Sequence, residues 1–135
     1  MFDVLDMGAS GLVAQRARMD TIAGNVLNIN TTRNEQGEKI PFRRRLVVFQ
    51  AGAAKDSPKP GVHVKEIKLD QTPFKERYEP GHPDADPKTG IVKYPNVDLM
   101  TEFTNMMEAS RAYEATVTMM ETSKAMFNST MRLIA

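Results

Sequence analysis

Hydrophobic residues recur every seven positions near both ends of the chain. Near the N-terminus the side chains that share this spacing are those of Leu5, Leu12, Met19 and Val26. Ile22 and several small residues occupy the three- and four-residue offsets between them. Such spacing places side chains on one face of an α-helix. Residues 3–30 contain no proline, and the polar run Asn28 to Thr32 favours a turn, so the pattern predicts an amphipathic helix over residues 3–30.

The C-terminal series is longer and has no gap. Its members are Leu99, Met106, Tyr113, Met120, Phe127 and Ile134. The residues that widen this stripe at the four-residue offset are Phe103, Val117 and Met131. Neither glycine nor proline occurs from Asp98 to Ile134, and Asn96 or Asp98 can cap the start. We predict a helix over Asp98 to Ile134, which at 1.5 Å per residue would be roughly 55 Å long.

The middle of the chain has a different pattern. Residues 33–94 contain seven of the eight prolines. Residues 42–50 and 62–70 are rich in β-branched and aromatic residues with partial alternation, which predicts two strands that pair with each other. Shorter strand candidates cover residues 74–78 and 91–94, and a turn-rich loop separates them.

The predicted fold class is therefore α+β. Long N- and C-terminal amphipathic helices form a coiled-coil-like pair, antiparallel or parallel, with a small β-rich insert between them. The predicted organisation is an N-terminal helical segment over residues 1–32, the insert over residues 33–95 and a C-terminal helical segment over residues 96–135.

The two apolar stripes are wider than this chain can cover. An insert of this size cannot shield both helices, and a two-helix pair buries only one side of each. Because a buried large apolar side chain contributes about 1.5–3 kcal/mol, leaving half a dozen exposed would forgo on the order of 10 kcal/mol. We therefore favour assembly into a larger structure, with a closed coiled-coil oligomer acting as an adaptor, or a self-sufficient monomer, as alternatives. Many of the ten methionines lie in the C-terminal segment, and their flexibility suits non-identical neighbours.

Composition and charge exclude several classes of function. The formal net charge is +1, from 18 basic and 17 acidic residues, and gives no reason to expect nucleic acid as a partner. The chain has no cysteine, which excludes disulfide and thiolate chemistry. The run Arg43 to Arg45 is interpreted as a solvated strand edge, with an interface to an acidic neighbour as the alternative. No run of apolar residues approaches the roughly 18–20 that a membrane span needs, so no transmembrane segment is expected.

Candidate chemistry is sparse. His82, Asp84 and Asp86 superficially offer metal ligands, but the prolines between them indicate a turn without a rigid scaffold, so a small metal-dependent enzyme is a remote alternative. Neither a nucleophile motif nor a phosphate-binding loop is present. We expect no enzyme activity, no cofactor and no small-molecule substrate. Asp3 and Asp6 stand where a secretory signal would carry basic residues, so any export is expected to proceed without a cleaved signal peptide.

The two end segments resemble the signatures of the bacterial flagellar axial proteins. At the end of the first helix stands Asn25-x-x-Asn28-x-x-Thr31, preceded by the run Ser10 to Arg16. The run Met107 to Ala115 resembles the matching C-terminal signature of the same family. Departures from the family pattern occur at Leu27, where a small residue is usual, at Thr116, where Asn is common, and at Ile91, where an aromatic is more usual.

The middle of the chain narrows this resemblance. The segments Tyr78 to Asp86, Gly90 to Val92 and Pro95 to Asp98 are similar to those of the proximal rod members of the family. The short chain length fits as well, because distal rod and hook proteins carry much larger inserts.

The resemblance implies a structural subunit of the basal-body rod. Such subunits polymerise through their terminal helices into a hollow helical tube that transmits torque and encloses the export channel. It further implies type III export, a location in the periplasmic rod, and as partners copies of itself, other rod proteins and the membrane ring or its adaptor. The side chains that we expect at the assembly interface are those of Leu5, Leu12, Met19, Ile22, Asn25, Val26, Asn28, Thr31, Leu99, Phe103, Met106, Tyr113, Val117, Met120, Phe127, Met131 and Ile134.

Overall fold

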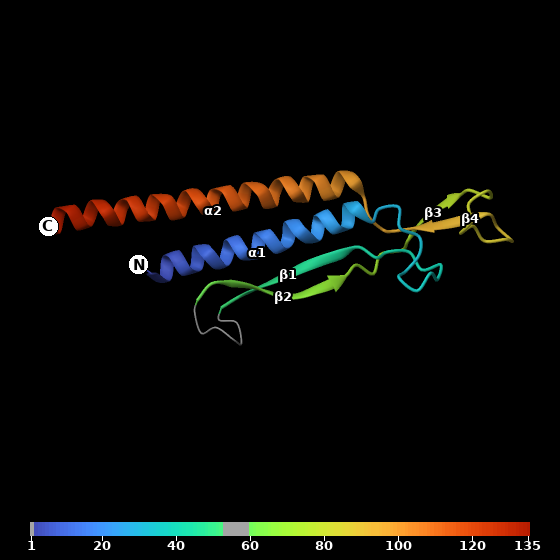
Figure 1. Ribbon diagram of the computed structural model, residues 1–135, viewed down its shortest axis with the longest axis horizontal. Helices are drawn as coiled ribbons and strands as arrows, with labels where there is room; N and C mark the ends of the chain where they lie inside the picture. Colours follow the sequence, from blue (N-terminus) through green and yellow to red (C-terminus); the bar gives the residue numbers. More distant parts are fainter. Residues whose placement is uncertain (1, 53–59) are drawn as a thin grey trace.

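The computed structural model describes residues 2–52 and 60–135. Its elements, in chain order, are α1 (Phe2–Leu27), β1 (Arg45–Ala51), β2 (Val62–Leu69), β3 (Lys75–Tyr78), β4 (Ile91–Tyr94) and α2 (Leu99–Ile134). Figure 1 shows an elongated molecule in which α1 and α2 lie side by side and run in opposite directions. The β1–β2 hairpin lies along α1 on the side away from α2, and the β3–β4 hairpin lies beyond one end of the helix pair. The predicted α+β class, with two long helices and a small β-rich insert, is confirmed.

The ends of the helices follow from local polar side chains. The carboxylate of Asp98 accepts hydrogen bonds from the backbone N–H (3.1 Å) and the hydroxyl (2.8 Å) of Thr101, which caps α2 one residue from the predicted start. At the other helix, α1 ends at Leu27 and not at residue 30 as predicted. The reason is that the Asn28 amide donates back to the Gly24 carbonyl at 2.8 Å, so residues 28–30 form a turn.

The predicted strand pair is present as an antiparallel hairpin, and the two shorter strand candidates pair with each other in a second one. Arg45 lies opposite Leu69 in β1–β2, and a bulge interrupts the register between Val48 and Phe49. In the second hairpin Tyr78 lies opposite Ile91. β1 begins three residues later than predicted, because the side chain of Asn96, and not a strand, accepts the hydrogen bond of the Arg44 N–H at 2.8 Å.

The helix pair is held by a thin core of small residues. Ala109 of α2 and Ala14 of α1 are buried, and so is Ile22 on the same helix. A side chain at Gly8 would place its Cβ 2.7 Å from the Cγ of Met120, so glycine is what lets the helices approach here. On the hairpin side, the hydroxyl of Ser10 accepts a hydrogen bond from the Val62 N–H at 3.1 Å. α1 is thus packed on two sides, by α2 and by the hairpin.

The last turns of α2 extend beyond α1. α2 has 36 residues and α1 has 26, and Met120 lies beside Gly8. Because α1 begins six residues before Gly8 and runs antiparallel, it reaches to about residue 126 of α2. Residues 127–134, here called the α2 overhang, therefore extend past the described start of α1, as Figure 1 shows. In the part of the chain that the structure describes, no helix is long and apolar enough to cross a membrane.

Candidate assembly surface and its polar junction

The first asparagine of the Asn-x-x-Asn-x-x-Thr motif fastens the hairpin to the helices. Asn25 lies on α1 and is 1% exposed. Its amide oxygen accepts from the N–H of Arg45 and its amide nitrogen donates to the carbonyl of the same residue, both at 2.9 Å. The same nitrogen donates to the carboxylate of Glu102 at 3.1 Å. One side chain therefore joins α1, the start of β1 and the first turn of α2.

A buried ion pair completes this junction. Glu102 is fully buried, and its carboxylate accepts from the Nε of Arg44 at 2.5 Å. The guanidinium of Arg44 also lies 3.3 Å from the carboxylate of Asp70. A backbone hydrogen bond from Thr72 and the guanidinium of Arg44 lower the pKa of Asp70 below its usual value. A buried carboxylate is tolerated only when paired and hydrogen-bonded, and here both conditions are met.

Asn96 closes the junction from the segment before α2. Its oxygen accepts from the Arg44 N–H, and its nitrogen donates to the carbonyls of Asp70 (3.1 Å) and Thr72 (3.2 Å) and to the Thr72 hydroxyl (2.9 Å). Arg43 donates to the same two carbonyls, and its guanidinium stacks on the ring of Phe74 at 4.3 Å. We call the set formed by Asn25, Arg44, Asp70, Asn96 and Glu102 the polar junction.

The interpretation of the arginine run as a solvated edge, or as an interface to an acidic neighbour, is wrong for Arg43 and Arg44. Both side chains are half-buried and bond to groups of the same chain. Only Arg45 is exposed, with its guanidinium 5.4 Å from the ring of Phe42. The run supplies internal ion pairs because Arg44, just before β1, reaches Glu102 of α2 and Asp70 after β2.

The loop with the suggested metal ligands is hydrogen-bonded to the turn that follows α1. Asp84 accepts from the Nε of Arg33 and the hydroxyl of Thr32, both at 2.6 Å, and these bonds lower the pKa of its carboxyl. His82 accepts the Asp84 N–H through Nδ1 at 3.0 Å. Among the described residues, no group of three acidic, histidine or cysteine side chains is placed to hold a metal ion. Asp84 ties the turn after α1 to the loop before β4.

The two predicted stripes differ in exposure. On α1 the members of the seven-residue series are half-buried and Ile22 is buried. On α2 the half-buried members are Met106, Tyr113, Val117 and Met120, whereas those exposed to solvent are Leu99, Phe103, Phe127, Met131 and Ile134. Asn25, Asn28 and Thr31 bond within the chain, the Thr31 hydroxyl donating to the Asn28 oxygen at 3.1 Å.

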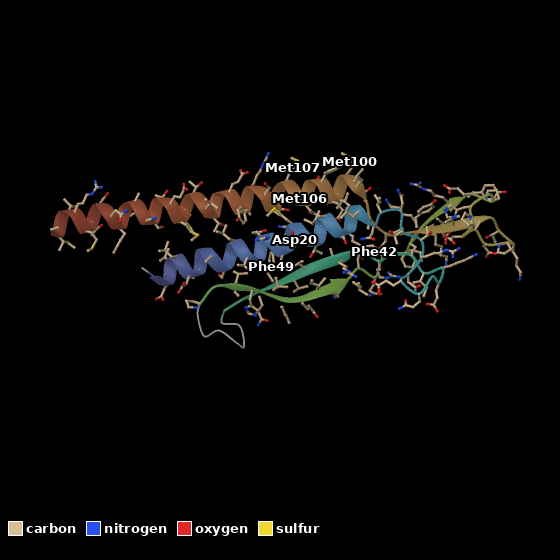
Figure 2. The ribbon with its side chains drawn as sticks, viewed as in Figure 1. Asp20, Phe42, Phe49, Met100, Met106 and Met107 are labelled. Carbon is tan, nitrogen blue, oxygen red and sulfur yellow. The ribbon has the colours of Figure 1, made fainter. Side chains whose placement is uncertain are left out.

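Several exposed apolar side chains were not among the predicted interface residues. Met100 and Met107 point away from α1, whereas Met106 lies on the side of α2 that faces it (Figure 2). Met119, Met126 and Leu133 form a second exposed series on α2. Their spacing of seven was visible in the sequence and would have revealed them.

An apolar groove opens where α1 ends and α2 begins. It encloses about 270 Å³. The apolar side chains that line it, here called the end groove, are those of Ile22, Ala23, Val26, Leu27, Phe103 and Met106. Glu102 also lines it, and its carboxylate is already bonded within the polar junction. The end groove and the α2 overhang lie at opposite ends of the helix pair.

Comparison with known proteins identifies the family. Residues 5–33 match the family model described as flagella basal body rod protein, and residues 88–133 match that of the flagellar basal body rod FlgEFG protein C-terminal. A protein of Escherichia coli O6:H1 named flagellar basal-body rod protein FlgC is 40% identical, with 98% of this chain and 97% of the relative covered. Proteins of the same name from Borreliella burgdorferi (35% identical, 99% and 97% covered) and Bacillus subtilis strain 168 (37%, 93% and 92%) are also similar. The chain belongs to the FlgC family.

This membership confirms the resemblance to flagellar axial proteins drawn from the end motifs and the narrower one to the FlgC type drawn from the middle segments. The chain is a structural subunit of the flagellar basal-body rod, located in the basal body, and not an enzyme. It assembles with copies of itself and other rod proteins. The N-terminal match covers α1 and the turn after it, and the C-terminal match covers β4 and α2.

The departures from the family pattern have simple structural settings. Leu27 is 83% exposed at the rim of the end groove, so it does not alter packing within the chain. The methyl group of Thr116 would lie 3.8 Å from a Cβ built on Gly11, so it faces α1. Ile91 is half-buried at the start of β4.

Proposed function

We propose that this rod subunit joins its neighbours through the apolar stripes of α1 and α2, with the helix pair forming the inner wall of a hollow helical tube. The observation that supports this is the uncovered end of α2, where Phe127, Met131 and Ile134 are 39%, 50% and 76% exposed. Burial of a large apolar side chain contributes about 1.5–3 kcal/mol, so covering these three would stabilise the rod by on the order of 5 kcal/mol.

In this proposal the residues of the Asn-x-x-Asn-x-x-Thr motif do not contact neighbouring subunits themselves. Asn25, Asn28 and Thr31 bond inside the chain, so they shape the end of α1 and the root of the hairpin that neighbours meet. Residues 1–32 and 96–135 are the rod-core segments, and residues 33–95 are the insert between them.

The wider setting is what the resemblance of the end motifs and the middle segments implies, and the relatives' names as basal-body rod proteins support it. The subunit reaches the rod by type III export without a cleaved signal peptide. It occupies the proximal part of the rod, beside other rod proteins and the membrane ring or its adaptor. The tube transmits torque and encloses the export channel.

Phe127→Asp tests this proposal most cleanly. Met120→Asp affects the same stripe, but Met120 also packs on Gly8, so that variant disturbs the helix pair itself. Phe127→Asp adds a charge where α2 begins to extend past the start of α1, so we expect normal expression and helix content but no rods and no motility. Asn128→Asp is the matched control, because it adds the same charge one residue away at an exposed polar position.

Normal motility of the Phe127→Asp strain would show that this stripe is not the interface. Sedimentation of the purified chain examines the alternative of a closed coiled-coil adaptor. A discrete dimer or trimer that never extends with concentration would favour that alternative, because head-to-tail contacts form open arrays.

A further inference from the structure

The β3–β4 hairpin stands apart from the other regular elements. In the part of the chain that the structure describes, neither β3 nor β4 packs on a helix or on the β1–β2 hairpin. Figure 1 shows the hairpin beyond the end of the helix pair. Since no helix or sheet surface fixes the direction of this hairpin, the contacts of its loops must do so.

The end of the hairpin nearer to the helices is held at the polar junction. Tyr94, the last residue of β4, lies opposite Lys75, and Asn96 of the polar junction follows two residues later. Just before β3, the ring of Phe74 stacks against the guanidinium of Arg43 at 4.3 Å. Attachment at this one end would leave the hairpin free to pivot, so a fixed direction needs a second contact at the other end.

That second contact is made by Asp84, in the loop that joins β3 to β4. Its side chain is 7% exposed. The Nε of Arg33 donates to one oxygen of its carboxylate and the hydroxyl of Thr32 donates to the other, both at 2.6 Å. Because both oxygens are bonded, the carboxylate is fixed in orientation as well as in position. We call Thr32, Arg33 and Asp84 the outer contact.

The loop that carries Asp84 is itself bonded to the hairpin. The N–H of Asp86 donates to the carbonyl of Ile91 at 3.0 Å, and the carbonyl of Asp86 accepts from the N–H of Gly90 at 2.8 Å. The Nδ1 of His82 accepts from the N–H of Asp84 at 3.0 Å. A contact that fixes Asp84 therefore also fixes the start of β4.

The turn that carries Thr32 and Arg33 is bonded to α1 in a similar way. The Asn28 amide donates to the carbonyl of Gly24 at 2.8 Å, and the Thr31 hydroxyl donates to the Asn28 oxygen at 3.1 Å. Asn28 and Thr31 are the last two residues of the Asn-x-x-Asn-x-x-Thr motif. The outer contact therefore connects α1 to the hairpin through two hydrogen-bonded turns.

We propose that Asp84 is a positioning residue for rod assembly, whose bonds to Thr32 and Arg33 fix the direction in which the β3–β4 hairpin extends from the helix pair. Without them the hairpin pivots about the polar junction while the helix pair stays folded. Ordering a pivoting hairpin at every subunit contact costs free energy, which opposes assembly. This role needs only the assembly that family membership shows, whichever apolar residues form the interface.

Spin labels report the direction of the hairpin, and the absence of cysteine makes labelling specific. Glu76→Cys on β3 and Glu114→Cys on α2 provide the label sites, since both residues are exposed and neither forms an ion pair among the described residues. Pulsed electron paramagnetic resonance of the full chain should give one narrow distance distribution. Asp84→Ala should broaden it to about twice that width, with unchanged helix content by circular dichroism. Arg33→Ala should broaden it as well, and its half-exposed side chain makes unfolding a poor explanation.

Asp86→Ala is the matched control. It removes the same side chain from the same loop, but the carboxylate of Asp86 accepts only from the Lys88 N–H within that loop, at 2.9 Å. The width should therefore stay unchanged. Arg33→Ala added to Asp84→Ala should cause no further broadening, because both changes remove the same bond.

Two spectroscopic results would overturn the proposal. An unchanged width in Asp84→Ala would mean that the burial of Val92 and Tyr94 already fixes the hairpin. Equal broadening by Asp86→Ala would mean that the folding of the loop sets the direction, and not the outer contact.

Motility examines the consequence for assembly. We expect Asp84→Ala cells to lose rods and motility and Asp86→Ala cells to keep both. Motile Asp84→Ala cells whose purified subunit shows the broadened distribution would refute the need for a fixed direction. Phe127→Asp leaves the outer contact intact, so a motile Phe127→Asp strain would refute the role of the stripes alone.

Discussion

Replacement of Glu102 by alanine removes the acceptor at the centre of the polar junction. Two hydrogen bonds are lost, from the Nε of Arg44 at 2.5 Å and from the Asn25 amide at 3.1 Å. Breaking a buried ion pair from one side typically costs about 3–5 kcal/mol, because the other charge stays buried. Arg44 keeps Asp70 at 3.3 Å and its side chain is 16% exposed, so the low end applies, about 3 kcal/mol. That is a large part of the about 5–15 kcal/mol that stabilises a typical domain.

Urea unfolding followed by circular dichroism measures this loss. With a slope of about 2 kcal/mol per molar urea, the midpoint should fall by roughly 1.5 M. Glu108→Ala is the matched control, since Glu108 lies on the same helix and pairs with Arg18 at 3.0 Å, but its side chain is 66% exposed. An exposed pair contributes about 0–1 kcal/mol, so that midpoint should move by less than about 0.5 M.

A paired apolar replacement sharpens the test. Glu102→Leu combined with Arg44→Met removes both charges together, and such replacements are often neutral or stabilising. We expect the double variant to regain most of the stability that Glu102→Ala loses. Equal midpoints for Glu102→Ala and Glu108→Ala would refute the view that the junction holds the hairpin to the helices.

Two further predictions concern single carboxylates. Asp98→Ala removes the cap of α2 and should lower the free energy of unfolding by about 1 kcal/mol, whereas Asp98→Asn, which can still cap, should cost less; a urea titration of each checks this. The lowered pKa of Asp84, caused first by the hydrogen bond from Arg33 and then by that from Thr32, stabilises the fold fully above the unfolded value of about 3.9. This stabilisation is lost as the pH falls through the lowered folded pKa. The urea midpoint of the natural chain should therefore drop more between pH 7 and pH 3 than that of Asp84→Asn, and equal drops would contradict the assignment.

The sequence predicted the elements well where one physical signal dominates. Seven-residue spacing located both helices, and a run without glycine or proline ended with Ile134 as expected. The first hairpin and the strands of the second followed from β-branched content and turn residues, whereas the pairing of β3 with β4 was not predicted. What the spacing could not supply was the antiparallel direction of the pair, or the contact of the hairpin with α1, because both depend on contacts between residues far apart in the chain.

The polar junction could not be predicted from the sequence, for a different reason. Its members are ordinary surface residue types, and Glu102 fits the first turn of an exposed helix as readily as a buried ion pair. Arg44 stands in a basic run that is usually solvated. These charges are buried only because the end of α1, the residues before β1 and the start of α2 pack together. Neither composition nor periodicity predicts contacts between segments so distant in sequence. The motif around Asn25 pointed to the position but not to the bonds that it makes.

The junction also bears on the order in which the chain folds. Its Asn25–Glu102 bond joins residues 77 positions apart, whereas the partners within each hairpin are close in sequence. Closing a long loop costs entropy before its contacts stabilise anything, so the hairpins can form early and the helix pair locks last. Until Glu102 meets Arg44 the two helices are joined only through the segment that contains the two hairpins. A chain built in this way cannot complete its polar junction until its C-terminal third is available, so it stays open while it is being delivered from its N-terminal end.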